Sequence, residues 1–164
     1  MGYITRYGGF WGMIPQTTGN VYWVSPGDTY VVEGRTYSAS NNHDGLSPER
    51  AVRTIDYAVG LTSANAGDVI VLLRGSHSVS ATVAVDVAGI TITGLPGASP
   101  LKGLHKNAGQ SRQPTRIVST ETAGIVFTVT VADVEIAYIH FDDIINGQNI
   151  SVSNAADRCY VHDC

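Results

Sequence analysis

The sequence predicts an all-β protein built from short, mostly parallel strands and a single short helix. Charged residues make up only 15% of the 164 residues, whereas there are 18 glycines, and this composition favours tightly turned β-structure over a helical domain. Residues 69–73, Val-Ile-Val-Leu-Leu, form a continuous apolar run that is typical of a strand buried on both faces of a parallel sheet. Similar apolar groups then recur at intervals of about 21 to 25 residues, which indicates a stacked repeat.

Residues 1 to about 24 combine large apolar side chains with glycines and almost no charge. Left exposed, such side chains would form a larger apolar patch than soluble monomers usually tolerate. We interpret them as an arm that docks on another chain, because aromatic residues and methionine are enriched in interface cores. An arm folded back on its own domain is the alternative. The expected anchor residues are Tyr7, Phe10, Trp11, Met13, Ile14, Tyr22 and Trp23.

Residues 21–24 and 29–32 are predicted strands separated by the turn sequence Ser-Pro-Gly-Asp. Their spacing predicts a hairpin-like antiparallel unit, so residues 1–36 form an N-terminal region distinct from the stacked strands of residues 37–164. The loop that follows contains His43 and Asp44, which could form a metal or acid–base pair. A turn stabilised by its own polar side chains fits these residue types better.

A helix is predicted over residues 47–60. Ser47 is suited to the N-cap position, and Pro48 then occupies the first helical position, where its missing N–H costs nothing. A helix this short depends on what it covers. We therefore expect its apolar stripe, above all Val52, Ile55 and Val59, to pack on the end of the strands that follow.

Residues 44–77 also carry a family resemblance. They read DG-x-SPE-x-A-x-x-TI-x-x-A, followed by AGD-x-I-x-L-x-x-G-x-H. This pattern resembles the entry of right-handed parallel β-helix proteins of the pectate-lyase-like superfamily, a fold also found in bacteriophage tailspikes and fibres. The resemblance covers residues 44–94, and it is more specific for fold than for function. It implies an N-terminal capping α-helix that closes the open end of the solenoid.

About four turns of the solenoid are predicted, near the minimum for a stable stack. A loop at 95–114 interrupts them; its cationic side chains are Lys102, His105, Lys106 and Arg112. Strands are expected at residues 69–73, 82–85, 90–93, 116–118, 125–131, 134–141, 150–152 and 159–161. No terminal cap is recognisable near Cys164, so we expect further chain or a partner to cover that end, because a bare end exposes unpaired backbone.

Two groups of residues near the C-terminus could carry chemistry. Cys159, His162, Asp163 and Cys164 are metal-ligand types, but closed zinc sites need four ligands, usually from two clusters, and no second cluster exists. We therefore predict structural cysteines, no metal and no cofactor. The carboxylates form the other group, where a solvated corner is the main interpretation and a lyase or glycosidase site the alternative. They are Asp133, Glu135, Asp142 and Asp143.

For function, the chain is mildly acidic, with a net charge of −4 and no basic run, so nucleic acid is not an expected partner. No apolar run is long enough to insert in a membrane, and the N-terminus lacks the pattern of a secretory signal. The resemblance implies a structural bacteriophage virion protein, assembled in the host cytoplasm. It would be a tail fibre, tailspike or head-attached decoration protein for host attachment.

In this interpretation the arm binds capsid or tail proteins, and the solenoid presents a surface for a cell-surface polysaccharide. We expect a homo-oligomer, with a trimer as one option. The alternative is a polysaccharide lyase or depolymerase of the β-helix type. We see no nucleophile motif, phosphate loop or nucleotide fingerprint. A secreted enzyme would normally carry an export signal, so the non-enzymatic interpretation is the main one, with an enzyme carried on a virion as a further option.

Overall fold

The computed structural model describes residues 17–32, 34–95, 115–119, 124–142 and 148–164. The described chain is mostly strand with a single α-helix, which confirms the all-β prediction. None of its helices has the length and hydrophobicity that crossing a bilayer requires.

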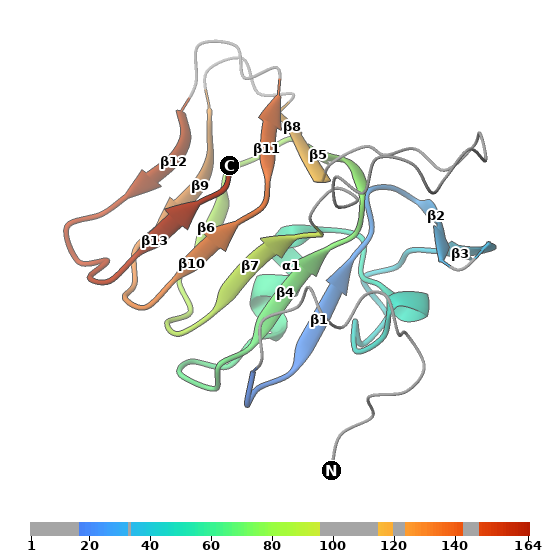
Figure 1. The fold of residues 1–164 in the computed structure, drawn as a ribbon, viewed down its shortest axis with the longest axis horizontal. Helices are drawn as coiled ribbons and strands as arrows, with labels where there is room; N and C mark the ends of the chain where they lie inside the picture. The colour runs from blue at the N-terminus through green and yellow to red at the C-terminus, as the bar shows by residue number, and fades with distance from the viewer. Residues whose placement is uncertain (1–16, 33, 96–114, 120–123, 143–147) are drawn as a thin grey trace, which may run out of the picture.

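Three parallel sheets make up most of the structure (Figure 1). The first contains, in spatial order, β1 (Val21–Val24), β4 (Val69–Leu72), β7 (Thr91–Gly94), β10 (Glu135–Ala137) and β13 (Tyr160–His162). The second contains β5 (Gly75–Val79), β8 (Thr115–Ser119) and β11 (His140–Asp142), and the third β6 (Val83–Val85), β9 (Ile125–Val129) and β12 (Gln148–Val152). From β4 onward the chain visits the three sheets in rotation, and each circuit adds one strand to each sheet.

Side chains stack in register between successive circuits. In the first sheet Tyr22 pairs with Ile70, Ile70 with Ile92, and Ile92 with Ile136. All four are buried in the larger hydrophobic cluster, together with Ile117 and Phe127 of the other two sheets. Because strand residues alternate between the two faces, the neighbouring rows of the first sheet point outward. The interior rows therefore hold the circuits together, whereas the outward residues of β1 and β4 belong to a second hydrophobic cluster.

The predicted pairing of the first two strands is wrong. β1 joins β4 in parallel, with Val21 opposite Val69, whereas β2 (Thr29–Val32) pairs antiparallel with β3 (Arg35–Ser38). A boundary near residue 36 therefore does not separate an arm from the stacked strands, because β1 is the edge strand of the first sheet.

The same pairing overturns two expected anchors. Tyr22 and Trp23 lie on opposite faces of β1, and both are buried in the described structure, Trp23 with only 1% of its surface exposed. Trp23 packs with Val71 and with Tyr30 of β2, so the β2–β3 hairpin covers the outer face of the first strands. These two aromatic residues stabilise the protein's own fold rather than an interface.

The predicted helix also has different bounds. Residues 47–60 divide into a 3-10 helix, η2 (Pro48–Arg50), and the α-helix α1 (Ile55–Leu61). Between them Val52 is extended and forms a parallel bridge with Val24. Its N–H donates to the Trp23 carbonyl, and its carbonyl accepts from the Ser25 N–H, each at 2.9 Å. Pairing with β1 therefore outweighs the helical propensity of this segment.

The caps change accordingly. The Thr54 hydroxyl accepts a hydrogen bond from the Tyr57 N–H at the start of α1, whereas the Ser47 side chain makes no capping bond. Val52, Ile55 and Val59, the residues expected to pack under the helix, are all buried in the larger cluster. In Figure 1, α1 lies behind the first sheet, and it contacts β1, β4 and β6.

Two strand predictions also differ from the structure. The predicted strand at 134–141 is two strands, β10 and β11, because Tyr138 between them has a φ of 56° and turns the chain to the next sheet. β5 was not predicted, since its sequence GSHSV has no apolar alternation.

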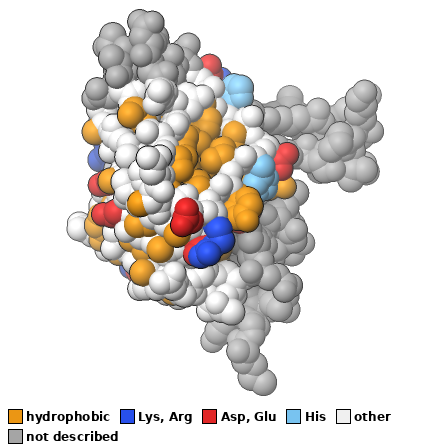
Figure 2. Space-filling model, turned by 90° about the vertical axis from the view of Figure 1, so that its left-hand side faces the viewer, with side chains coloured by type: hydrophobic (Ala, Val, Ile, Leu, Met, Phe, Trp, Pro, Cys, Tyr) orange, Lys and Arg blue, Asp and Glu red, His pale blue; other side chains and the backbone are white. Residues whose placement is uncertain are grey.

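At the opposite end of the stack from α1, hydrophobic side chains gather at the centre of the surface (Figure 2). Val152 and Val161, of the last strands of two sheets, are exposed there.

We expect Ile55→Asp to lower the free energy of unfolding by about 3–5 kcal/mol, because it would bury a charge without a partner. The measurement is chemical denaturation monitored by circular dichroism. Tyr57→Asp is the matched control, since it introduces the same charge two residues away on the half-exposed side of α1. Equal losses in the two variants would contradict the view that α1 covers the interior.

Candidate ligand-binding face

The outer face of the first sheet carries a group of polar and aromatic side chains at its last two strands. Glu135 of β10 and His162 of β13 project from this face: the neighbouring Ile136 is buried in the interior, and Tyr160, which pairs with Glu135, lies on the same side of β13 as His162. We call the group the His162 patch. It consists of Thr91, Glu135, Tyr138, Tyr160, His162 and Asp163.

His162 is held between two carboxylates. Its Nε2 lies 2.9 Å from Glu135 Oε1, and its Nδ1 lies 2.9 Å from Asp163 Oδ2. The other Glu135 oxygen accepts a hydrogen bond from the Thr91 hydroxyl at 3.1 Å. A carboxylate only accepts hydrogen bonds, so both ring nitrogens donate and the imidazolium form is favoured. The hydrogen bond to Glu135, and then that to Asp163, raise the pKa of His162 above its usual value.

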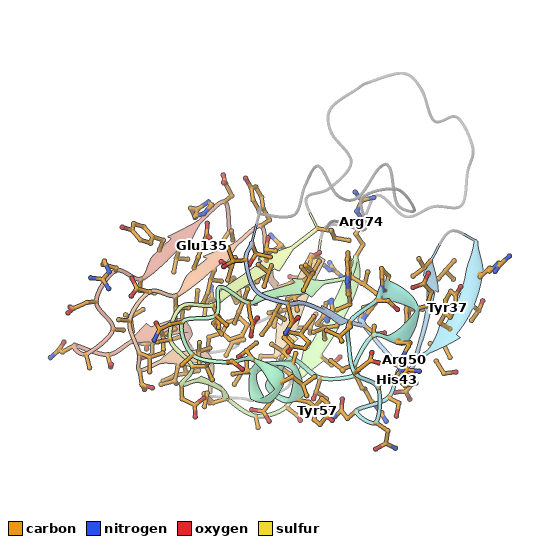
Figure 3. All side chains as sticks on the ribbon, turned by 90° about the horizontal axis from the view of Figure 1, so that it is seen from below. Tyr37, His43, Arg50, Tyr57, Arg74 and Glu135 are labelled. Carbon is orange, nitrogen blue, oxygen red and sulfur yellow. The ribbon has the colours of Figure 1, made fainter. Side chains whose placement is uncertain are left out.

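Two tyrosines flank this set. The Tyr138 ring meets the His162 ring edge to face, with centroids 5.8 Å apart. Tyr138 and Tyr160 remain exposed over 42% and 62% of their surfaces. Figure 3 shows Glu135 on the opposite side of the molecule from Tyr57 of α1. An exposed face that combines aromatic rings with fixed donors and acceptors can stack on an apolar surface of a ligand while it binds hydroxyl groups.

The other predicted carboxylates do not join the patch. Asp133 forms a two-point ion pair with Arg158, whose hydrogen bonds lower the pKa of that carboxyl. Asp142 lies on the second sheet, where it accepts from Arg116 at 2.7 Å. Asp143 lies outside the described residues. Of the four predicted carboxylates, only Glu135 therefore belongs to the His162 patch. His162 and Asp163, which join it there, come from the other predicted group.

The Cys-x-x-His-x-Cys sequence does not converge on one point. Cys159 packs against the interior cluster, and burial raises the pKa of its thiol, whereas His162 faces outward. Cys164 is exposed, with its Sγ 3.2 Å from the His162 carbonyl oxygen. In the described part of the chain, no group of three or more His, Cys, Asp or Glu side chains is arranged to hold a metal ion. Alternating strand geometry separates residues that look like one motif in sequence.

The His43–Asp44 pair forms a turn, as the preferred interpretation predicted. His43 Nδ1 lies 3.2 Å from the Ala51 carbonyl oxygen. Asp44 accepts from the Leu46 N–H and from Arg50, and these bonds, the Leu46 bond first, lower the pKa of its carboxyl. Both side chains are used to shape the chain before η2.

Sequence reasoning singled out Glu135 and His162 but did not join them, and it missed Tyr138 and Tyr160. The available signal was the repeat of 25 residues, which places Tyr160 opposite Glu135 and His162 opposite Ala137.

The five remaining anchor residues and the four cationic residues of the 95–114 loop lie outside the described residues. They are Tyr7, Phe10, Trp11, Met13 and Ile14, and Lys102, His105, Lys106 and Arg112.

Comparison with known proteins adds no relative to this picture. No family model matches the chain, and no match was found among curated proteins or solved structures.

The two carboxylate partners of His162 should be visible in the titration of its imidazole. We expect an NMR titration to place the His162 pKa above 6.5, and Glu135→Gln to lower it. The raised value means that the interaction contributes fully to stability below about pH 6.5 and is lost as the pH rises through the folded-state pKa. Asp133→Asn is the control, because its carboxylate binds Arg158 instead. A His162 pKa that does not respond to Glu135→Gln would contradict the observed pairing.

Proposed function

We propose that this protein is a structural component of a bacteriophage virion, built as a right-handed parallel β-helix, that binds a host-surface polysaccharide through the His162 patch. The combination of two exposed tyrosines with an imidazole held between carboxylates carries the proposal. The N-terminal arm attaches the protein to capsid or tail proteins.

The solenoid part of the proposal is supported by the rotation of the chain through three parallel sheets. One circuit takes 22 residues from Val69 to Thr91 and 25 from Glu135 to Tyr160, as the register pairs require (91 − 69 and 160 − 135). Stacked circuits of this kind form extended outer faces, which suit a long, repetitive ligand better than a compact one. The helix at the start of the coil is in keeping with the capping helix that the resemblance implies.

The polysaccharide part is supported by the chemistry of the patch. Sugar rings offer an apolar face edged with hydroxyl groups, and exposed tyrosines present a complementary apolar ring with a polar end. Glu135, Asp163 and the Thr91 hydroxyl offer acceptors for sugar hydroxyls beside the rings. The patch is an open surface, so a chain can lie along it without being threaded into a closed pocket.

A polysaccharide lyase or depolymerase is the second candidate, and one observation favours it. An imidazole beside two carboxylates can exchange a proton with a bound sugar, as general acid–base catalysis requires. Binding and catalysis are separated by the fate of the polymer. If the protein shortens the polysaccharide during incubation, and the His162→Gln variant does not, the enzyme is favoured.

We expect the purified protein to bind at least one member of a panel of bacterial surface polysaccharides in a glycan array. Tyr138→Ala and Tyr160→Ala should each weaken that binding by roughly fivefold to tenfold, since each removes one stacking ring. Tyr57→Ala, which removes an exposed tyrosine on the far side of the coil, is the control. An equal loss in all three variants, or no binding across the panel, would count against the patch as the binding surface.

The attachment role is tested by deleting residues 1–16. The deletion stops there because Thr17 and Asn20 bond to Gly67 and Asp68 and so belong to the coil. We expect the shortened protein to keep its melting temperature but to be absent from purified particles. Trp11→Ala should reduce incorporation in the same assay, since aromatic anchors carry much of an interface's binding energy. Normal incorporation of the shortened protein would disprove attachment through the arm.

A further inference from the structure

A groove of about 680 Å³ lies at the α1 end of the coil, away from the His162 patch. It is lined by three segments: the turn at residues 25–28, residues 53–56 at the start of α1, and residues 77–83, which include the end of β5 and the start of β6. Its volume falls in the range of ordinary ligand sites.

The groove exists because the second sheet starts one strand later than the first. The first sheet has β1 before β4, whereas β5 is the first strand of the second sheet. After β1 the chain crosses only the beginning of β5, where Pro26 lies so close to Gly75 that an added Cβ would come within 2.8 Å of it. The chain then leaves to form β2. The groove therefore occupies the place that one more strand of the second sheet would fill.

The edge of β5 faces this place. In the described residues β5 pairs with β8 on one side, and no strand pairs with it on the other. α1 contacts β1, β4 and β6, so the helix closes the interior without completing the second sheet. An edge strand presents backbone donors and acceptors that readily accept another strand. Residues 77–79 of β5 line the groove, so this part of the strand borders the space where a further strand would lie.

The charges of the groove favour a basic ligand. Asp28 and Arg53 form an ion pair at 2.6 Å, and Asp56 has no ion-pair partner among the described residues. Two carboxylates and one guanidinium leave one net negative charge. His77 does not offset it, because its Nε2 bonds to the Leu73 carbonyl at 2.7 Å and burial lowers its pKa to about 4. The imidazole is therefore neutral at pH 7.

We propose that this groove binds an extended, basic peptide segment of a partner protein, which adds a strand to the edge of β5. The peptide's backbone pairs with β5, and a lysine or arginine of the peptide lies near Asp56. Recognition of this kind draws affinity from main-chain hydrogen bonds and specificity from alternate side chains. The site is independent of the polysaccharide proposal, since it shares no residue with the His162 patch.

A suitable probe is the capped pentapeptide Thr-Arg-Ile-Val-Ser, the sequence of β8. That strand already pairs with the other edge of β5, with Ile117 opposite His77, so its side-chain alternation suits this sheet, and it carries one arginine. The control peptide has the same sequence with alternate backbone amides methylated, which removes hydrogen-bond donors and keeps every side chain.

The experiment measures binding of both peptides to the full chain by isotope-edited NMR, with amide exchange read at each strand. We expect saturable binding of the unmodified peptide only, with added protection at β5. Ser80→Trp should abolish binding by filling the groove, and Asp56→Asn should weaken it roughly threefold. Ser63→Trp, at an exposed serine outside the groove, should bind as the parent protein does.

Three outcomes would overturn the proposal. The first is equal binding of the methylated peptide, which would mean that no strand is added. The second is protection at β11, the opposite edge of the same sheet, instead of β5. The third is no binding of the peptide, or a neutral oligosaccharide that shifts the same groove resonances in its place.

Discussion

The arrangement of the first circuit depends on one buried carboxylate, Asp68. Its Oδ1 accepts the Asn20 N–H at 2.6 Å, and its Oδ2 accepts the Ser63 N–H at 2.8 Å. Asp68 therefore joins the chain just before β1 to the chain just after α1, at the residue that precedes β4. A buried carboxylate without such partners would be strongly unfavourable, so the three segments are held in one arrangement. Two glycines allow the close approach: Gly67 has a φ of 75°, and a Cβ on Gly19 would lie 2.4 Å from Asp68 Oδ1.

The edge position of β1 explains the broken helix. β1 needs a backbone partner on the side away from β4, and Val52 supplies it through two hydrogen bonds of 2.9 Å. The chain can become helical only after that bridge, so α1 begins at Ile55 under the Thr54 cap. The Tyr30 hydroxyl accepts the Ala51 N–H at 3.0 Å, which ties the hairpin to the same point. Residues 48–61 could thus either form one helix that covers the interior or pair with β1. Val52 pairs with β1, and the helix α1 begins three residues later.

Residues in the interior of the stacked sheets and residues on their surface are constrained differently. Stacked apolar rows hold successive circuits in register, and they constrain every second residue of each strand. On β1 and β4 the outward residues are also buried, beneath the β2–β3 hairpin, whereas on β10 and β13 they are more open, and it is there that Glu135 meets His162 across 27 positions of sequence. The groove along β5 has a different origin, since it follows from an unequal number of strands in neighbouring sheets. The two candidate sites therefore lie on different parts of the coil, so a ligand at one leaves the other accessible.

The sequence by itself determined the all-β class, the buried run at β4, the circuit of 22 to 25 residues where no long segment is inserted, and the apolar residues beneath α1. These features depend on local composition and periodicity, which the order of residues records directly. Only the tertiary structure decided the partner of β1, the start of α1 at Ile55 rather than after Ser47, and the burial of Trp23 beneath the β2–β3 hairpin. β5 escaped prediction because one of its two interior positions is held by a neutral His77 instead of an aliphatic side chain. In each case, segments distant in sequence compete for the same backbone hydrogen bonds or for burial. The contacts that decide between them form only when the successive circuits of the chain have stacked.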